Sequence, residues 1–225
     1  MNKKYQRIVS IGAHSLDAEL MGGPLMIKYA LQGSHCTFVH VTKGRLENPD
    51  ATVAENDAYV AKITEENKNV AKTMHCDSYA MGYLSSELPS EQEFVTILKE
   101  YLIKEKVDLV ITHARGTLHA RHYYTYDTVT QAVRQLNQEG YDINLLYGEN
   151  CEDLIGFIPT LYVSMSQEVE ETWFKGLANY TIFNGEINDV PYPEYYKTMG
   201  IVRRFEVGSK LPVKAYMHAG LLDKE

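Results

Sequence analysis

The chain has 225 residues, a length that suits one large domain or two small ones, and we expect one. Its apolar fraction of 44% and charged fraction of 23% are ordinary for a globular protein and argue against extensive disorder. A net charge of −8 gives no basic footprint for nucleic acid. No apolar stretch reaches the length of a membrane-spanning helix, so we also expect no membrane insertion.

Cysteine usage and the N-terminal residues indicate the compartment. Cys36, Cys76 and Cys151 form neither a disulfide framework nor a Cys-x-x-Cys metal pattern. The apolar run 8–13 behind the basic N-terminus is too short for the core of a signal peptide. We therefore expect a cytoplasmic protein whose cysteines stay unpaired in a reducing compartment.

Strand-like and helix-like patterns alternate along the chain. Short, nearly continuous apolar runs predict strands, and amphipathic runs predict helices. In chain order we expect a strand at 7–13, a helix at 17–33, a strand at 36–41, a helix at 53–74, a strand at 78–83, a helix at 90–104, a strand at 107–112, a helix at 124–136, strands at 143–147 and 161–165, and a helix at 168–183.

This alternation predicts the fold class. Apolar strands that alternate with helices are typical of a parallel sheet covered on both faces. We expect an α/β fold, a Rossmann-like three-layer sandwich with a mostly parallel open sheet, in a single domain over residues 1–225. The segment 184–210, which contains Pro191, Pro193 and several tyrosines, is predicted to be an irregular lid or loop.

Histidine and aspartate side chains follow two of the predicted strands. His14 and Asp17 lie three residues apart after the first strand, and His119 and His122 follow the strand at 107–112. Open α/β sheets bind ligands at the carboxyl ends of their strands. Two imidazoles and a carboxylate that leave room for water match a catalytic zinc site. Alternatively, these side chains are loop hydrogen-bonding groups, and Asp17 caps the helix that it begins.

Other chemistries have little support in the sequence. The glycine pattern of dinucleotide-binding proteins is absent, and so is the Gly-x-Ser-x-Gly motif of serine hydrolases. Nothing around Cys151 argues for an activated thiolate. The histidine-bearing loops are therefore the main candidates for function.

The same loops resemble a known family. The motif 13–17, Ala-His-Ser-Leu-Asp, resembles the Ala-His-Pro-Asp-Asp signature of the LmbE/PIG-L family of N-acetylglucosamine deacetylases. The pairs Thr112-His113 and 119–122, His-Ala-Arg-His, resemble that family's Thr-His and His-Pro-Asp-His. Further similarities at 147–149, 159–163 and 175–177 follow in the family's order, so the resemblance covers essentially the whole chain.

The resemblance implies a metal-dependent hydrolase that removes the acetyl group from a small-molecule amino-sugar conjugate by metal-activated water. It implies Zn²⁺, or another divalent metal, held by His14, Asp17 and His122. His119 would help to stabilise the oxyanion, which makes His119 and Asp17 the implied catalytic residues. Because related folds commonly self-associate, we also allow for a homo-oligomer.

Two departures from the family's motifs concern catalysis. Leu16 stands where the family has its general-base Asp, and loss of a general base typically lowers the rate by ~10²–10⁴. Arg121 stands where the family has the Asp of His-Pro-Asp-His. A guanidinium binds carboxylates or phosphates through two hydrogen bonds, so we expect Arg121 to bind a negative group of the substrate. Alternatively, Arg121 points to solvent or pairs with Asp127.

Three interpretations follow from these departures. The first is an active hydrolase whose base is His119, Glu19 or a loop carboxylate. The second is a catalytically impaired pseudoenzyme or a metal-dependent sugar-binding protein. The third is a metal-free scaffold in which the motif residues only form hydrogen bonds. We favour the enzyme by analogy, because scaffolds of this family usually keep hydrolytic chemistry.

Overall fold

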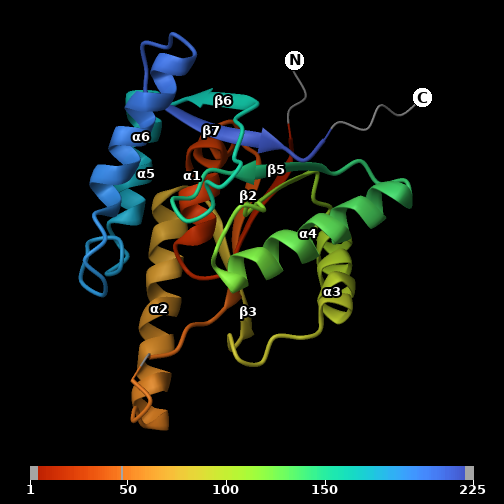
Figure 1. The fold of residues 1–225 in the computed structure, drawn as a ribbon, viewed down its shortest axis with the longest axis vertical. Helices are drawn as coiled ribbons and strands as arrows, with labels where there is room; N and C mark the ends of the chain where they lie inside the picture. Colours follow the sequence, from red (N-terminus) through yellow and green to blue (C-terminus); the bar gives the residue numbers. More distant parts are fainter. Residues whose placement is uncertain (1–4, 47, 221–225) are drawn as a thin grey trace.

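The computed structural model describes residues 5–46 and 48–220. Its strands join in one sheet of seven, in the order β3-β2-β1-β4-β5-β7-β6 (Figure 1). The strands are β1 (Arg7–Gly12), β2 (His35–Thr42), β3 (Asp77–Tyr83), β4 (Leu109–Thr112), β5 (Asn144–Gly148), β6 (Leu161–Ser164) and β7 (Val213–His218). The helices are α1 (Asp17–Ala30), α2 (Val53–Thr73), α3 (Glu91–Lys104), α4 (Ala120–Gln138), α5 (Gln167–Leu177) and α6 (Tyr192–Glu206).

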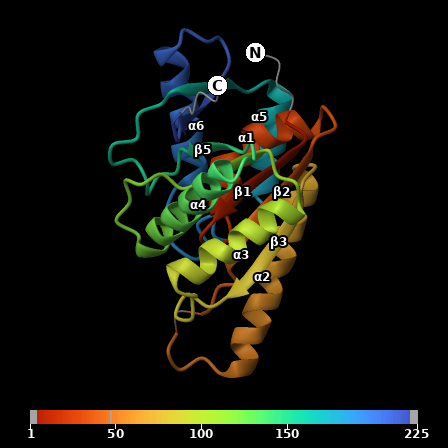
Figure 2. The ribbon, with the colours of Figure 1, turned by 90° about the vertical axis from the view of Figure 1, so that its right-hand side faces the viewer.

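Helices cover both faces of the sheet, which makes a three-layer sandwich (Figure 2). One apolar core lies under α1, α2, α5 and α6, and the other under α3 and α4. Strand β4 is mostly apolar along its length because its side chains enter both cores. Leu109 and Ile111 pack into the first core, and Val110 packs into the second. No helix formed by the described residues is both long enough and apolar enough to cross a bilayer.

The direction of the strand order reverses at β1. Strands β2 and β4 pair with β1 on opposite sides, and both run parallel to it. Strand β5 continues the parallel series beside β4, whereas β7 runs antiparallel to β5. In such sheets the loops at the carboxyl ends beside the reversal diverge and leave room for a ligand. The predicted α/β fold with a mostly parallel open sheet is confirmed.

The turn between β1 and α1 is tightly packed. A Cβ atom at Gly12 would lie 2.6 Å from the backbone nitrogen of Ala18, so only glycine fits there. The Ser10 hydroxyl donates a 2.7 Å hydrogen bond to the carbonyl of Ala18, which ties the helix to the strand. Leu16 precedes α1 with φ = 85°, a left-handed conformation that leucine rarely adopts.

The C-terminal third differs from the sequence-based expectation. The segment 184–210 was predicted to be an irregular lid or loop, which is wrong for Tyr192–Glu206, because these residues form α6. Tyr192, Tyr196 and Gly200 are spaced by four residues and are all buried, which is the pattern of a helix packed on one side. Pro193 lies in the first turn, where proline is compatible with a helix. Strand β7, which the sequence did not predict, follows this helix.

A buried polar pair anchors α1 to the sheet. The Glu19 carboxylate on α1 lies 2.9 Å from Nε2 of His40 on β2, and both side chains are fully buried. The Tyr180 hydroxyl donates a 3.0 Å hydrogen bond to the same carboxylate oxygen. A buried carboxylate is tolerated only while such partners remain.

We expect His40→Ala to lower the free energy of unfolding by about 3–5 kcal/mol, because it leaves the Glu19 carboxylate buried with one partner fewer. Urea unfolding measures this change. His35→Ala on the same strand is the control, because the 3.5 Å pair of His35 with Asp77 is largely exposed and should contribute less than about 1 kcal/mol. Equal losses for the two variants would contradict the account.

Candidate metal centre

The site is built from three loops, which follow the adjacent strands β1, β4 and β5. Four of its side chains belong to the β1–α1 turn or to the start of α4, and the others lie close to the ends of β4 and β5. In chain order they are His14, Asp17, His113, His119, His122, Asn150, Glu152 and Asp153. Segments that are up to 133 residues apart in the sequence therefore meet at one edge of the sheet.

Asp17 lies at the centre of the site. Its Oδ2 accepts a 2.8 Å hydrogen bond from the backbone N–H of His14. The same oxygen lies 3.2 Å from Nδ1 of His14 and 3.4 Å from Nε2 of His122. Its Oδ1 accepts a 3.2 Å hydrogen bond from the side-chain amide of Asn150. One carboxylate thus connects the loops that follow β1, β4 and β5.

Asp153 forms hydrogen bonds with two of the histidines. Its Oδ2 lies 2.7 Å from Nδ1 of His113, and its Oδ1 lies 2.9 Å from Nδ1 of His122. Asp153 is fully buried, and each of its oxygens accepts one of these ring N–H groups. These two hydrogen bonds keep a proton on Nδ1 of each ring, so that Nε2 is the ring nitrogen left for other partners.

The two histidines use their Nε2 atoms differently. Nε2 of His113 accepts a 3.0 Å hydrogen bond from the backbone N–H of Ala13, so both ring nitrogens of His113 are engaged within the protein. Nε2 of His122 faces Asp17 instead. Two groups could hold an ion among the described residues, His14–His119–His122 and Asp17–His113–His122. Because Nε2 of His113 is already engaged, the donors that remain are His14, Asp17, His119 and His122.

Two donor pairs that share Asp17 have the spacing of ligands in a tetrahedral zinc site. Ligands at roughly 2.0–2.1 Å from a tetrahedral zinc ion lie about 3.3 Å from one another. Oδ2 of Asp17 lies 3.2 Å from the His14 nitrogen and 3.4 Å from the His122 nitrogen. The donor types, two imidazoles and one carboxylate, also suit zinc. The residues present therefore fit a divalent metal.

The charges of the metal-free site follow from its burial and its neighbours. Burial acts to raise the pKa of Asp17, but His122 and His113 outweigh it and hold that pKa well below its usual value. Burial acts to lower the pKa of His122, but the carboxylates of Asp17 and Asp153 raise it to about 10. Burial, together with the nearby His122 and His14, lowers the pKa of His119 to about 4. A metal ion would therefore displace a proton from His122, whereas His119 is already neutral at pH 7.

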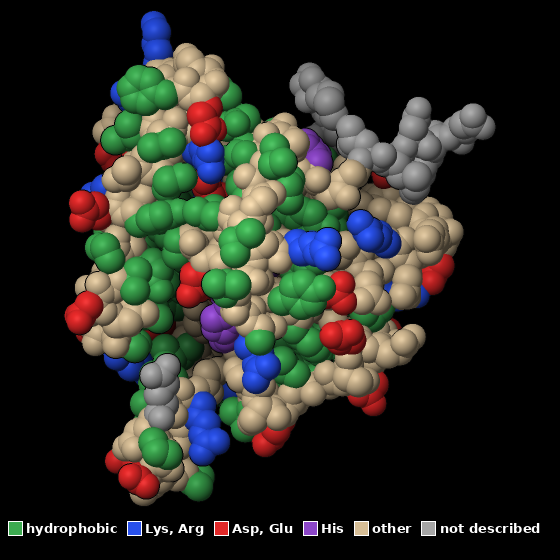
Figure 3. Space-filling view, viewed as in Figure 1, with side chains coloured by type: hydrophobic (Ala, Val, Ile, Leu, Met, Phe, Trp, Pro, Cys, Tyr) green, Lys and Arg blue, Asp and Glu red, His purple; other side chains and the backbone are tan. Residues whose placement is uncertain are grey.

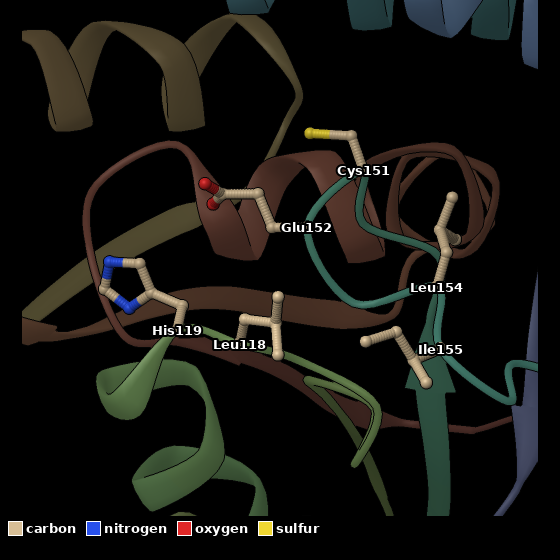
Figure 4. A pocket seen from close by; sticks show the side chains of 6 residues that line it. All are labelled: Leu118, His119, Cys151, Glu152, Leu154 and Ile155. Carbon is tan, nitrogen blue, oxygen red and sulfur yellow. The ribbon is translucent and has the colours of Figure 1, made fainter.

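A pocket of about 600 Å³ opens beside these residues. His119 and Glu152 form its polar side, while Leu118, Leu154 and Ile155 form an apolar side (Figure 4). On the face seen in Figure 3, a histidine side chain reaches the surface in a hollow between acidic and apolar groups. A small polar molecule with an apolar substituent fits this lining.

The structure brings four of the residues singled out from the sequence together. His14, Asp17, His119 and His122 lie around one point, with the rings of His14 and His119 5.0 Å apart and those of His119 and His122 4.4 Å apart. Arg121 lies between the two histidines of α4 and forms no ion pair with any described residue. The alternative pairing of Arg121 with Asp127, both described residues, is not formed, and Asp127 accepts a 2.6 Å hydrogen bond from Gln131.

Two other residues that the sequence singled out, Glu19 and Leu16, lie in the core and not at the pocket. Glu19, considered as a replacement base, is fully buried in the core and bonded to His40 and Tyr180. It is therefore wrong as a catalytic base. Leu16 is only 4% exposed and belongs to the apolar core under α1. The position of the family's general base thus has no group that accepts a proton.

Asn150 and Asp153 were missed by sequence reasoning. A signal was available, because the predicted strand at 143–147 is followed by a polar run that includes Glu149, Asn150, Glu152 and Asp153. The loop after a buried parallel strand lies at the ligand-binding edge of the sheet, as the histidine loops do. Only the pairing of Asp153 with His113 and His122 required the structure.

Comparisons with known proteins place the chain in a family. It matches the family model PIG-L, described as GlcNAc-PI de-N-acetylase, over residues 9–133. This match covers more than half of the chain, and the protein belongs to the PIG-L family. No curated protein matches its sequence.

Solved structures share its fold at low sequence identity. A deacetylase of teicoplanin biosynthesis is 15% identical, with a TM-score of 0.71 over 95% of this chain and 98% of the other. The N,N'-diacetylchitobiose deacetylase from Pyrococcus horikoshii is 16% identical, with a TM-score of 0.72 over 96% and 84% of the two chains. The 4-carboxy-2-hydroxymuconate hydratase from Pseudomonas putida is 14% identical, with a TM-score of 0.76 over 97% and 98%. Since a hydratase shares the fold, fold alone does not decide the reaction.

We expect Asp153→Asn to weaken zinc binding by about 10- to 100-fold, because the amide nitrogen would face a ring N–H and no longer orient one of the histidines. Calorimetric titration with zinc measures the affinity. Asp17→Ala should abolish binding, and Asp127→Asn on the surface of α4 is the control. Wild-type affinity in Asp153→Asn would show that Asp153 does not support a metal site.

Proposed function

We propose that the protein is a zinc-dependent amide hydrolase that removes an acetyl group from a small amino-sugar conjugate. The observation that carries this proposal is that Oδ2 of Asp17 lies 3.2 Å from a nitrogen of His14 and 3.4 Å from a nitrogen of His122, beside a pocket lined by His119 and Glu152. Membership of the PIG-L family supports an N-acetyl substrate. The names of the deacetylases that share the fold support the same class.

In this proposal His14, Asp17 and His122 hold the ion, and the other residues position them. A bound zinc ion would polarise the amide carbonyl and lower the pKa of water. Asn150 holds the Asp17 carboxylate, and Asp153 orients the His122 ring. His119, neutral at pH 7, donates a hydrogen bond to the carbonyl oxygen as negative charge develops on it.

A binding role without turnover is the second candidate. The observation that favours it is Leu16, which replaces the proton acceptor of the family's motif with a buried hydrocarbon side chain. Such a protein would keep the metal and the pocket while releasing no acetate. The two candidates make the same prediction for metal binding and opposite predictions for amine release.

Arg121 is proposed to select the substrate. It stands between His119 and His122 in the first turn of α4, and no described carboxylate neutralises it. An always-charged guanidinium at this place favours a substrate with a carboxylate or phosphate group near the amide.

We expect one zinc ion per chain and measurable release of free amine from N-acetylglucosamine or its phenyl glycoside. Metal analysis of protein purified without chelator, followed by a fluorescent amine assay, measures both. Removal of the ion with a chelator should abolish release, and added zinc should restore it, because the ion supplies the Lewis acid. Stoichiometric zinc without amine release would support the binding role. A protein that binds no zinc would contradict both candidates.

Arg121→Ala should weaken binding of N-acetylglucosamine 6-phosphate, by roughly the 1.5–3 kcal/mol of a charged hydrogen-bonded contact, and leave N-acetylglucosamine unaffected. Calorimetry on the zinc-loaded proteins measures both affinities. Arg115→Ala, in the exposed loop before α4, is the control for a general loss of positive charge. Equal changes for the acidic and the neutral sugar would contradict this role of Arg121.

A further inference from the structure

The proposed reaction lacks a proton acceptor at the usual place. Attack of water on an amide carbonyl requires a group that takes the proton released by the water. Leu16 offers none, and its side chain packs into the apolar core under α1. If the protein hydrolyses an amide as proposed above, another residue must take this proton.

Most carboxylates close to the site are already engaged. Asp17 has one oxygen bonded to His14 and the other to Asn150. Asp153 has one oxygen bonded to each of two histidines.

Glu149, another carboxylate close to the site, is 1% exposed and forms a 2.6 Å ion pair with Arg203.

Glu152 differs from Asp17, Asp153 and Glu149. Its side chain is 52% exposed, and its only ion-pair partner among the described residues is His122, with Oε2 3.7 Å from Nε2. This distance is longer than a hydrogen bond, so the Glu152 carboxylate keeps its lone pairs for another partner.

Glu152 is aimed into the pocket. Its carboxylate and the ring of His119 project into the same side of the cavity, with the apolar side chains of Leu118, Leu154 and Ile155 beside them (Figure 4). Glu152 therefore lines the pocket and also lies 3.7 Å from the nitrogen of His122 that faces Asp17.

The backbone around Glu152 is held on both sides. The backbone N–H of Glu152 donates a 3.3 Å hydrogen bond to Oδ1 of Asn150, whose amide is itself bonded to Asp17. The next residue, Asp153, is bonded to two histidines. Further along, the backbone N–H of Ile155 donates a 3.0 Å hydrogen bond to the carbonyl of Gly116. The same contacts that position the histidines thus position Glu152.

We propose that Glu152 is the catalytic base of this protein and replaces the carboxylate that is missing at Leu16. The water oxygen bonds to the amide carbon while Glu152 accepts the proton that the water releases. As the bond between carbon and nitrogen breaks, Glu152 returns that proton to the leaving nitrogen. The products are the carboxylic acid and the free amine. This inference rests on the proposed hydrolase function.

The test compares Glu152→Gln, Glu152→Asp and wild type, each loaded with zinc, using the phenyl glycoside of N-acetylglucosamine. Glutamine keeps the shape of the side chain but does not accept the proton, so kcat should fall by about 10²–10⁴. KM should stay within about twofold, because the substrate contacts remain. Glu152→Asp keeps a carboxylate and should have a kcat between the other two. Glu168→Gln, exposed on α5, is the matched control and should equal wild type.

Zinc affinity, measured by calorimetry on the same proteins, separates a base from a ligand. If Glu152 is a base, Glu152→Gln and wild type should bind zinc with equal affinity. A loss of zinc affinity in Glu152→Gln would overturn the inference and make Glu152 a metal ligand. Unchanged kcat in Glu152→Gln would overturn the role of Glu152 and leave the hydrolase standing. No turnover by zinc-loaded wild type would overturn the proposed function, and this inference with it.

Discussion

The buried carboxylate of Asp153 determines how the histidines can be used. Its two oxygens accept N–H groups from His113 and His122, so each ring keeps a proton on Nδ1 and only Nε2 is left for other partners. The two histidines nevertheless differ in role, because their Nε2 atoms have different surroundings. His113 directs Nε2 at a backbone N–H and ties the loop after β4 to the β1–α1 turn. His122 directs Nε2 at Asp17 and becomes available to a metal. The surroundings of Nε2 therefore distinguish the histidine that ties two loops together from the one that could bind a metal.

Under the proposed function, Leu16 removes a proton acceptor from the turn between β1 and α1, and the residues around Asp17 keep their contacts. The left-handed backbone at this position is strained for leucine, and the turn that contains it brings the backbone N–H of His14 to Oδ2 of Asp17. Core packing holds the leucine side chain. The ligands and the loop after β5 do not depend on the identity of this residue. A carboxylate on that loop can therefore take over the lost role without a change of fold.

How much of this structure can be predicted from the sequence depends on how far apart in the chain the contacting residues lie. His14 with Asp17 and His119 with His122 are neighbours within one turn, so their spacing alone indicates a shared site. The parallel sheet could be predicted because strands such as β4 are mostly apolar and buried along their whole length. The partners of Asp153 are 31 and 40 residues away, and no local pattern reveals such pairing. Helix α6 was missed because its prolines suggest a loop, and β7 because it enters the sheet antiparallel, outside the alternating pattern.

Anomalous diffraction from crystals of the zinc-loaded protein tests the central claim most directly. The account predicts one zinc ion bound by His14, Asp17 and His122, with Nε2 of His113 still accepting the backbone N–H of Ala13. It also predicts that both oxygens of Asp153 keep their histidine partners. Zinc bound to His113, with the hydrogen bond from Ala13 broken, would contradict the account, because the partner of Nε2 would then not decide which histidine is a ligand.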